Sequence, residues 1–350
     1  MFTNITVTEL IPLMENKQMT LIDVRSPVEF ENFSIPTSIN IPFFTNEERA
    51  EIGTIYTQIS ETAARDRGLE IISAKLPDFI KKFKAINGEK TVFCWRGGMR
   101  SRTTATLLDL MNIHVHRLDG GIRAYRKWVI EQLENIQLPP VAYVLSGLTG
   151  TGKTKILQTL QKEGYPVIDL EGMANHKGSI FGHIGQRPNN QKTFDALLVH
   201  RLRELQHAPF IMFESESSRV GKVTLPHFLL DLKGKSNFLM IELPIKERIN
   251  EILKDYRPWD NQSECLAAFL KIKSRIHTPV ANQIEQDLKS ENYKQAVRLL
   301  LEYYYDKRYK QIEPQYPDSE KIIIHVKNID EAIQVVKHVI PRIGSDQIIL

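Results

Sequence analysis

The chain has few cysteines and no long hydrophobic run. Its 350 residues contain only two cysteines, Cys94 and Cys265, so we expect reduced thiols rather than a disulfide framework. No apolar stretch reaches the roughly 18 residues that a membrane-spanning helix needs. The first residues also lack the basic, apolar and small-residue regions of a signal peptide. We therefore expect a cytoplasmic protein without a membrane partner.

An excess of charge of one sign is also missing. The net charge of +4 is too small to predict nucleic-acid binding by itself, because a soluble enzyme can carry it on a solvated surface. The content of 42% hydrophobic and 25% charged residues is typical of a globular protein. A chain of this length is long enough for two domains.

The first part of the chain alternates short apolar strands with amphipathic helices, which predicts an α/β domain over residues 1–137. A polar stretch at 46–68 predicts a helical insertion. A helix over 121–137 closes the domain, because prolines at 139 and 140 stop it. The other predicted elements are strands near 20–25, 38–42, 91–95 and 115–121, and helices near 69–86 and 101–112.

A second series of strands predicts another domain over residues 138–350. These strands are apolar without alternation, which is typical of a parallel sheet covered by helices on both faces. A mostly helical region from about 246 to 310 interrupts the series. The strands are predicted near 142–147, 165–171, 209–215, 237–243 and 321–326.

The segment FCWRGGMRS, residues 93–101, places Cys94 between a predicted strand and a predicted helix. Backbone N–H groups of the glycine loop and the positive end of the helix stabilise a thiolate at this position. Arg96 and Arg100 add positive charge, so Cys94 is predicted to be a nucleophile at neutral pH rather than a structural cysteine. Cys265 lies among apolar residues at helical spacing, and we expect it in a core.

The segment GLTGTGKT, residues 147–154, fits the pattern G-x-x-x-x-G-K-[ST] between a predicted strand and a predicted helix. Backbone amides are expected to cradle phosphates, with Lys153 neutralising their charge and Thr154 able to hold Mg²⁺. The second domain is therefore predicted to be P-loop NTPase-like. No other metal and no tightly bound cofactor is predicted. The predicted phosphate-binding residues are Gly147, Thr149, Gly150, Thr151, Gly152, Lys153 and Thr154.

The sequence leaves the ligand of this phosphate loop open. A nucleotide hydrolase usually has an aspartate after a later strand to position Mg²⁺, whereas the matching strand here ends in Glu214 and Glu216. Glutamate can replace aspartate, so a nucleotide is one candidate. The loop recognises a diphosphate without reading a base, so a diphosphate ester that has no base is another.

Two polar loops follow strands of the second domain. Loops at the carboxyl ends of parallel strands line ligand crevices, which makes His176, Lys177 and Ser179 of the first loop candidate contacts for substrate or RNA. In the second loop Arg219 is a candidate phosphate contact. The alternatives are that His176 is only a surface histidine and that the loop with Arg219 is only a solvated basic loop.

Four segments of the first domain together resemble the rhodanese family, a sulfur-transfer fold whose loop cysteine carries a persulfide. They are LIDVRSPVEF at 21–30, IPTSINIP at 35–42, the Cys94 loop, and LDGGIRAY at 118–125. One departure is that Arg100 stands six positions after Cys94, where common rhodanese loops place arginine at five. We interpret the longer loop as a wider anion cradle, suited to a phosphate-bearing or bulkier chalcogen donor rather than thiosulfate.

The two loops in one chain, with HKGSIFG at 176–182 and FESESSRVG at 213–221, resemble the tRNA 2-selenouridine synthase family. The resemblance implies a selenotransferase that converts 2-thiouridine to 2-selenouridine at the wobble position of the tRNA anticodon loop. It implies selenophosphate as selenium donor and an S-geranylated intermediate made from geranyl diphosphate. From the chemistry of the thiol loop we infer that Cys94 accepts selenium as an S-selanylcysteine, with Arg96, Arg100 and the loop amides holding the phosphate of the donor.

Several alternatives remain at this point. Geranyl diphosphate is assigned to Lys153 and selenium to Cys94, but the reverse pairing and a nucleotide at the phosphate loop stay open. Rival functions are a rhodanese-type sulfurtransferase with a nucleotide-binding regulatory domain, a small-metabolite kinase, and a noncatalytic tRNA-binding protein. Further candidate tRNA contacts are Arg65, Arg67 and the segment 302–310, although the last is more typical of a core.

Overall fold

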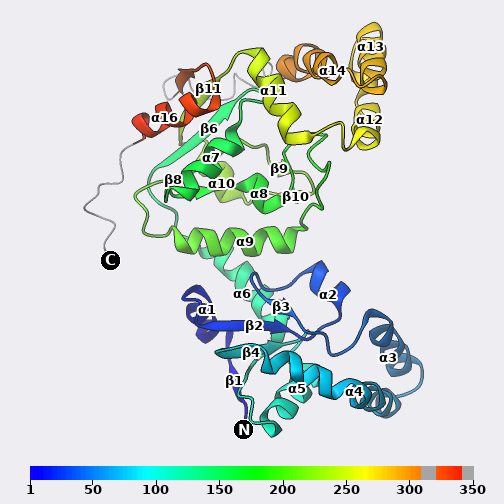
Figure 1. Cartoon of the computed structure of the whole chain (residues 1–350). Coiled ribbons are helices and arrows are strands. Elements are labelled where there is room, and N and C mark those ends of the chain that lie inside the picture. The colour runs from blue at the N-terminus through cyan, green and yellow to red at the C-terminus, as the bar shows by residue number, and fades with distance from the viewer. Residues whose placement is uncertain (309–320, 341–350) are drawn as a thin grey trace. The chain divides into compact units, whose positions relative to one another are not determined.

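The computed structural model describes residues 1–308 and 321–340, and it divides into two compact units (Figure 1). The first unit comprises residues 1–135 and 195–199, and the second comprises the rest of the chain. The last two residues of the predicted helical region 246–310 lie outside the described residues. None of the described helices is both long and apolar enough to cross a membrane.

The first unit is built on a five-stranded sheet in which every neighbouring pair is parallel. Its order is β1-β5-β4-β2-β3, so β4 is the central strand. The first strand escapes sequence prediction because three residues are too few to show a periodicity. The strands are β1 (Thr3–Ile5), β2 (Met19–Asp23), β3 (Ile39–Asn40), β4 (Glu89–Phe93) and β5 (His116–Leu118).

Helices cover both faces of this sheet. Leu21 and Phe93 pack in a cluster with α1 and α6, whereas their neighbours Ile22 and Val92 pack in a second cluster with α4 and α5. Because alternate residues of one strand are buried on opposite faces, the strands are apolar throughout. The helices are α1 (Val7–Glu15), α2 (Pro27–Asn32), α3 (Asn46–Gln58), α4 (Glu61–Lys84), α5 (Met99–Leu110) and α6 (Gly121–Asn135).

The predicted insertion at 46–68 forms α3 and the first two turns of α4. The latter helix begins at Glu61, earlier than the predicted residue 69, because the Ser60 hydroxyl accepts a hydrogen bond from the Ala63 amide and caps it.

The second unit contains a parallel five-stranded sheet of order β12-β11-β6-β8-β7. The central strand β6 has β8 on one side and β11 on the other, and the chain crosses from one side of β6 to the other between β8 and β11. Such a switch point opens a crevice at the carboxyl end of the strand. The strands are β6 (Ala142–Gly147), β7 (Val167–Ile168), β8 (Ile211–Glu214), β11 (Asn237–Glu242) and β12 (Lys321–His325).

Leu145 of β6, Leu157 of α7 and Ala332 of α16 share the main core of this unit, which confirms the predicted α/β class. A short antiparallel hairpin, β9 (Arg219–Val220) and β10 (Val223–Thr224), was not predicted. The helices around the sheet are α7 (Lys153–Lys162), α8 (Leu170–Ala174), α9 (Gln191–Glu204), α10 (His227–Lys233) and α16 (Ile329–Val339).

The predicted helical region has a hydrophobic core of its own, which includes Phe269, Ile284 and Leu300. Cys265 is buried beside it in a small cluster with Ile184, as expected for a core residue. The region consists of α11 (Ile245–Tyr256), α12 (Gln262–Leu270), α13 (Thr278–Lys289), α14 (Tyr293–Leu300), a 3-10 turn (Lys273–Arg275) and a π-helical turn (Leu301–Tyr305).

Candidate active-site loops

The thiol of Cys94 lies at the amino end of α5, directly after the central strand β4. Its Sγ is 3.2 Å from the Ser101 hydroxyl and 4.0 Å from the Gly98 carbonyl oxygen. The residue is only 3% exposed. The Ser101 hydroxyl, in the first turn of the helix, can therefore donate to Sγ of Cys94.

The thiol loop contacts the glycine pair Gly120–Gly121 at the start of α6. The Ile122 amide donates to the Cys94 carbonyl at 2.9 Å, and Arg117 Nη1 donates to the Gly97 carbonyl at 2.5 Å. Gly121 has φ +57°, and a Cβ there would lie 2.3 Å from the Cys94 carbonyl oxygen. Glycine is thus needed at position 121 because the two backbones touch there.

Replacing Gly121 by alanine is expected to lower the free energy of unfolding by about 3 kcal/mol, because positive φ and a backbone clash add together. Gly88→Ala is the matched control, since Gly88 has φ +74° but a Cβ there would have nothing within 4 Å. The control should lose only about 1 kcal/mol. Urea unfolding of both variants measures the difference, and equal losses would contradict the seating of the loop on Gly121.

The two predicted arginines of the thiol loop differ in their surroundings. Arg96 is exposed within the loop. Arg100 forms a two-pronged ion pair with Glu29 of α2, with Nη2 3.1 Å from Oε1. Burial raises the pKa of the Glu29 carboxyl, but the Arg100 guanidinium, with smaller effects of the Ser26 amide and Arg49, holds the pKa below its usual value. The charge of Arg100 is therefore offset by Glu29, and its contact with a donor phosphate stays a prediction.

The phosphate loop has the expected strand-loop-helix form between β6 and α7. Gly152 is the N-cap of α7 with φ +73°, and a Cβ there would lie 2.3 Å from the Ile329 side chain. Lys153 is folded back: its Nζ donates to the Gly147 carbonyl at 2.9 Å and reaches the Leu148 carbonyl at 3.5 Å. The Thr151 hydroxyl donates to Leu148 as well, at 2.9 Å.

A buried arginine of α11 forms a hydrogen bond with the backbone of the phosphate loop. Arg248 is 3% exposed, and its Nε donates to the Thr149 carbonyl at 2.8 Å. Its two terminal nitrogens pair with the Asp306 carboxylate at 2.6 and 3.0 Å. Arg248 does not stand out in the sequence, because the contact joins segments 99 positions apart.

Three glutamates gather beside the phosphate loop. The Thr154 hydroxyl donates to Glu171 Oε2 at 2.5 Å, and the Glu171 amide donates to Glu214 Oε1 at 2.6 Å. Glu214 is 1% exposed, and its Oε2 has no partner among the described residues. Glu216 interacts electrostatically with both Glu171 and Lys153. The structure thus brings the predicted Glu214 and Glu216 to the phosphate loop and adds Glu171.

Burial raises the pKa of all three carboxyls. Burial, together with the nearby Glu216 charge, raises the pKa of Glu171 to about 7. Burial also raises the pKa of Glu216, and burial with the Asp169 and Glu171 charges raises that of Glu214 well above its usual value. Carboxylate and hydroxyl oxygens are the ligands that Mg²⁺ prefers. The buried, unpartnered oxygen of Glu214 fits such an ion, which Thr154, Glu171, Glu214 and Glu216 would hold.

The raised pKa of Glu171 makes stability depend on pH. An unfolded glutamate has a pKa of about 4.3, so between about pH 5 and 7 the folded protein binds the extra proton. The free energy of unfolding should therefore fall, by about 2 kcal/mol, as pH rises from about 5 to 8. Urea unfolding with a chelator present measures this fall, which should be smaller in Glu171→Gln. An identical pH profile for the variant would contradict the assignment.

Of the remaining predicted contact residues, Lys177 and Ser179 bind to residues of α11, and Arg219 lies in the hairpin β9–β10. Lys177 donates to the Asp255 carbonyl, and its Nζ lies 4.8 Å from the centre of the Tyr256 ring. The Ser179 hydroxyl is 2.9 Å from the Tyr256 hydroxyl. Arg219 is exposed in β9. The roles of Lys177, Ser179 and Arg219 in binding substrate or tRNA stay predictions.

His176 is buried rather than on the surface. Its ring fills the space that side chains at Gly182 and Gly221 would occupy, and its Nδ1 has no partner among the described residues. Burial, with a smaller effect of His183, lowers the pKa of the ring. His176 therefore packs the polar loop against the hairpin β9–β10.

The arginines proposed for tRNA contact are engaged in surface ion pairs. Arg65 pairs with Glu61, and Arg67 pairs with Glu51 at 2.6 Å and with Glu70 at 2.9 Å. In the segment 302–310, Tyr304 is 8% exposed and Tyr303 is 40% exposed, while residues 309 and 310 lie outside the described residues.

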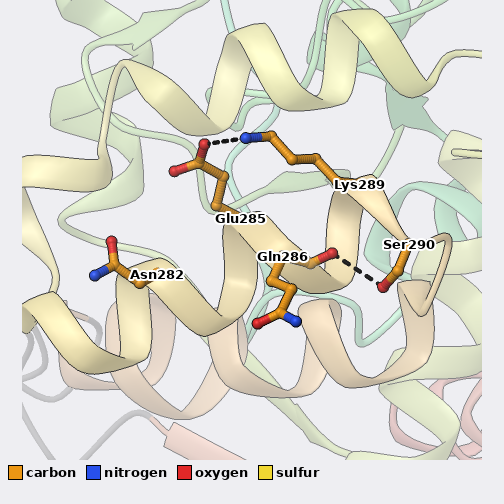
Figure 2. Close-up of a pocket in the computed structure, with 5 residues that line it drawn as sticks. All are labelled: Asn282, Glu285, Gln286, Lys289 and Ser290. Carbon is orange, nitrogen blue, oxygen red and sulfur yellow. Dashed lines mark hydrogen bonds and ion pairs between the residues drawn. The ribbon is translucent and has the colours of Figure 1, made fainter.

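A surface hollow of about 390 Å³ lies on α13, away from both loops in the sequence (Figure 2). It is lined by Asn282, Glu285, Gln286, Lys289 and Ser290, all from one helix and its C-cap. Hydrogen bonds from Lys273 and Lys289 lower the pKa of Glu285 to about 2. Because its charges already pair with one another, we do not consider this hollow a substrate site.

Comparison with known proteins agrees with the two loops. Residues 6–127 match the family model of the rhodanese-like domain, and residues 140–271 match that of the tRNA 2-selenouridine synthase AAA domain. The tRNA 2-selenouridine synthase of Marinobacter nauticus is 32% identical over 296 residues, which cover 81% of this chain and 78% of that protein. The chain belongs to the tRNA 2-selenouridine synthase family. This confirms the resemblance and the order of the two α/β domains.

Other relatives of the synthase family match a shorter region. The tRNA 2-selenouridine synthase of Shewanella piezotolerans is 31% identical over 245 residues, covering 67% of this chain and 65% of that relative, slightly less than two thirds. Among solved structures, the N-terminal domain of a putative ATP/GTP binding protein from Clostridium difficile is 34% identical. It covers 37% of this chain and 99% of its own, with a TM-score of 0.35.

Proposed function

We propose that this member of the synthase family replaces the sulfur of a wobble 2-thiouridine in tRNA by selenium. One observation carries the proposal: the chain joins a cysteine loop and a phosphate loop, each at the carboxyl end of the central strand of its own parallel sheet. A thiol loop alone suits sulfur transfer, and a phosphate loop alone suits many reactions. Their combination suits a reaction with one diphosphate and one chalcogen donor.

The phosphate loop serves the first step in this proposal. The sulfur of 2-thiouridine attacks C1 of geranyl diphosphate, the C–O bond breaks, and diphosphate leaves with the bonding electrons. Loop amides and Lys153 stabilise the charge that develops on the leaving group. For this, Lys153 Nζ exchanges the carbonyls of Gly147 and Leu148 for phosphate oxygens. A Mg²⁺ ion at Thr154 and the glutamates would supply further neutralising charge.

The thiol loop serves the second step. Alkylation of the sulfur makes C2 electrophilic and turns the sulfur into a leaving group, geranyl thiol. Selenium then displaces this thiol from C2. If Cys94 carries the selenium, its thiolate attacks selenium of selenophosphate and phosphorus leaves as phosphite with the P–Se electron pair. The terminal selenium then attacks C2, geranyl thiol departs, and a thiol reductant cleaves the S–Se bond. Direct attack by selenophosphate followed by hydrolysis of the P–Se bond releases phosphate and needs no reductant.

Mass spectrometry of nucleosides tests the proposal. The full-length protein is incubated with 2-thiouridine tRNA, geranyl diphosphate, selenophosphate and a thiol, and each small substrate is omitted in turn. We expect S-geranyl-2-thiouridine without selenophosphate, and 2-selenouridine only with both substrates. An unchanged nucleoside in every mixture would overturn the proposal. Thiosulfate-to-cyanide sulfur transfer that responds to ATP would then indicate the sulfurtransferase, and ATP turnover the kinase.

The proposal assigns tRNA and an enzyme that supplies selenophosphate as partners, and places the reaction in the cytoplasm. Exchanging the substrates also tests the reverse pairing. If excess selenophosphate, rather than inorganic diphosphate, competes with geranyl diphosphate in the alkylation step, the phosphate loop binds the selenium donor. Inhibition of the same step by ATP alone would indicate a nucleotide at this loop.

A further inference from the structure

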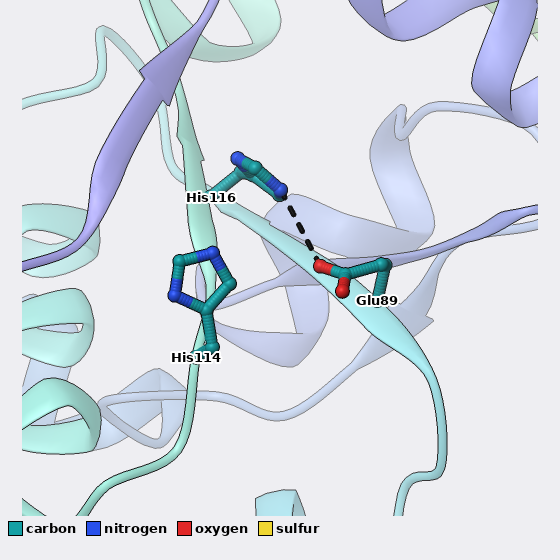
Figure 3. A group of neighbouring side chains, drawn as sticks. All are labelled: Glu89, His114 and His116. Carbon is teal, nitrogen blue, oxygen red and sulfur yellow. Dashed lines mark ion pairs between the residues drawn. The ribbon is translucent and has the colours of Figure 1, made fainter.

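Two histidines and a glutamate converge at the amino end of the first sheet, at the opposite end of β4 from Cys94 (Figure 3). Glu89 is the first residue of β4, His116 is the first residue of β5, and His114 lies just before it. The ligand atoms of the three side chains all lie within 4.8 Å of one another. We propose that Glu89, His114 and His116 form a zinc-binding site.

The distance between Glu89 and His116 matches a shared metal ion. Their Oε2 and Nε2 atoms are 3.4 Å apart. In a tetrahedral site with bonds of about 2.0–2.1 Å, neighbouring ligand atoms are about 3.4 Å apart. His114 is exposed, its ring centre is 5.3 Å from that of His116, and its ligand atom lies within 4.8 Å of those of the other two residues. Three protein ligands with an open fourth position are a common zinc arrangement.

A second contact orients the His116 ring for this role. Thr3 Oγ1 of β1 lies 2.7 Å from His116 Nδ1. When Nδ1–H donates to this hydroxyl, the lone pair of Nε2 faces the Glu89 carboxylate. Two electron-rich atoms at this separation need a cation between them or a proton on Nε2. Hydrogen bonds of this kind fix the tautomer of metal-binding histidines.

The surroundings leave the site open to a metal. The two cations adjacent to these residues in the sequence are engaged elsewhere: Lys90 Nζ donates to the Gly88 carbonyl at 2.6 Å, and Arg117 donates to Asn4 Oδ1 at 2.9 Å and to the Gly97 carbonyl at 2.5 Å. A surface hollow of about 280 Å³ borders Glu89 and His114, which gives access to solvent ligands. A simple ion pair would involve only His116 and Glu89. A metal site also accounts for the position of the His114 imidazole beside them. Bound zinc would join the amino ends of β4 and β5, and through Thr3 that of β1.

Competition against a chromophoric zinc chelator tests the site on the full-length, metal-free protein. We expect one bound zinc ion, lost in His116→Ala, His114→Ala and Glu89→Gln but kept in the surface control His338→Ala. Thr3→Val should weaken zinc binding by about 10-fold or more, the effect of removing a partner behind a histidine ligand. Zinc should raise the melting temperature of wild type and the control, but not of the ligand variants.

Cobalt substitution separates this site from the thiol loop. Co²⁺ bound by nitrogen and oxygen ligands shows weak visible bands without the thiolate charge-transfer band that binding at Cys94 would produce. Equal zinc affinity in wild type and His114→Ala would overturn the proposal, and His114 is exposed, so this variant is expected to fold. A thiolate band in wild type that disappears in Cys94→Ala would overturn it as well. Both readouts are independent of the proposed tRNA activity.

Discussion

Cys94→Ala is expected to abolish the formation of 2-selenouridine while leaving S-geranyl-2-thiouridine to accumulate. The thiol lies at the amino end of α5 beside Ser101, on a loop seated against Gly121, and nothing else in that loop is a nucleophile of comparable strength. We expect a loss of about 100-fold or more in selenium incorporation, measured by nucleoside mass spectrometry. Supplying tRNA that is already geranylated should not rescue the variant.

Cys265→Ala is the matched control, because Cys265 is the other cysteine and is buried in a core. This variant should keep both reactions. Phosphorus NMR of the wild-type reaction then tells what Cys94 does: phosphite with consumption of thiol indicates a selenium carrier. Phosphate without thiol consumption indicates that the loop positions selenophosphate for direct attack on C2. Full activity of Cys94→Ala would contradict either role.

Lys153→Ala is expected to stop the reaction one step earlier. Its ammonium group contacts the phosphate loop at the Gly147 and Leu148 carbonyls, and diphosphate departs poorly without it. The formation of S-geranyl-2-thiouridine should fall by about 100-fold or more. In contrast to the cysteine variant, tRNA that is already geranylated should restore selenium incorporation.

Lys155→Ala provides the control for a lost positive charge in the same helix. Lys155 pairs with Glu251 at 3.2 Å and is half exposed, so it does not face the loop carbonyls. We expect normal geranylation in this variant. If Lys153→Ala geranylates normally but fails with geranylated tRNA, the assignment of the two loops is reversed.

The sequence predicts the local parts of this structure better than the contacts between them. The strands β4 and β6 and the loops after them follow from continuous apolar runs and glycine spacing, which depend on neighbours in the chain. The contact of Arg248 with Thr149 and the pairing of Arg100 with Glu29 are invisible to such patterns. Each joins segments separated by more than 70 positions, 99 and 71 respectively.

Burial of polar groups is equally hard to read from the sequence. His176 stands in a glycine-rich polar loop, which is typical of a surface histidine, but Gly182 and Gly221 leave room for its ring inside the fold. Glu171 is one of many polar residues in the loop after β7, so nothing in the sequence distinguishes it from the others. Only the fold places it against Thr154. The short strands β1, β9 and β10 form because a neighbouring strand is available for hydrogen bonding. Their own residues do not favour a strand strongly enough to predict one.

The ion pair between Arg100 and Glu29 has a consequence for how donor preference can diverge within a family. A substitution at Glu29 in α2 would release a second guanidinium next to the thiol without changing any residue of the loop itself. Loops of identical sequence can therefore attract anions of different charge. Selection for another chalcogen donor can act on this helix, so a comparison of loop motifs alone would overlook the change.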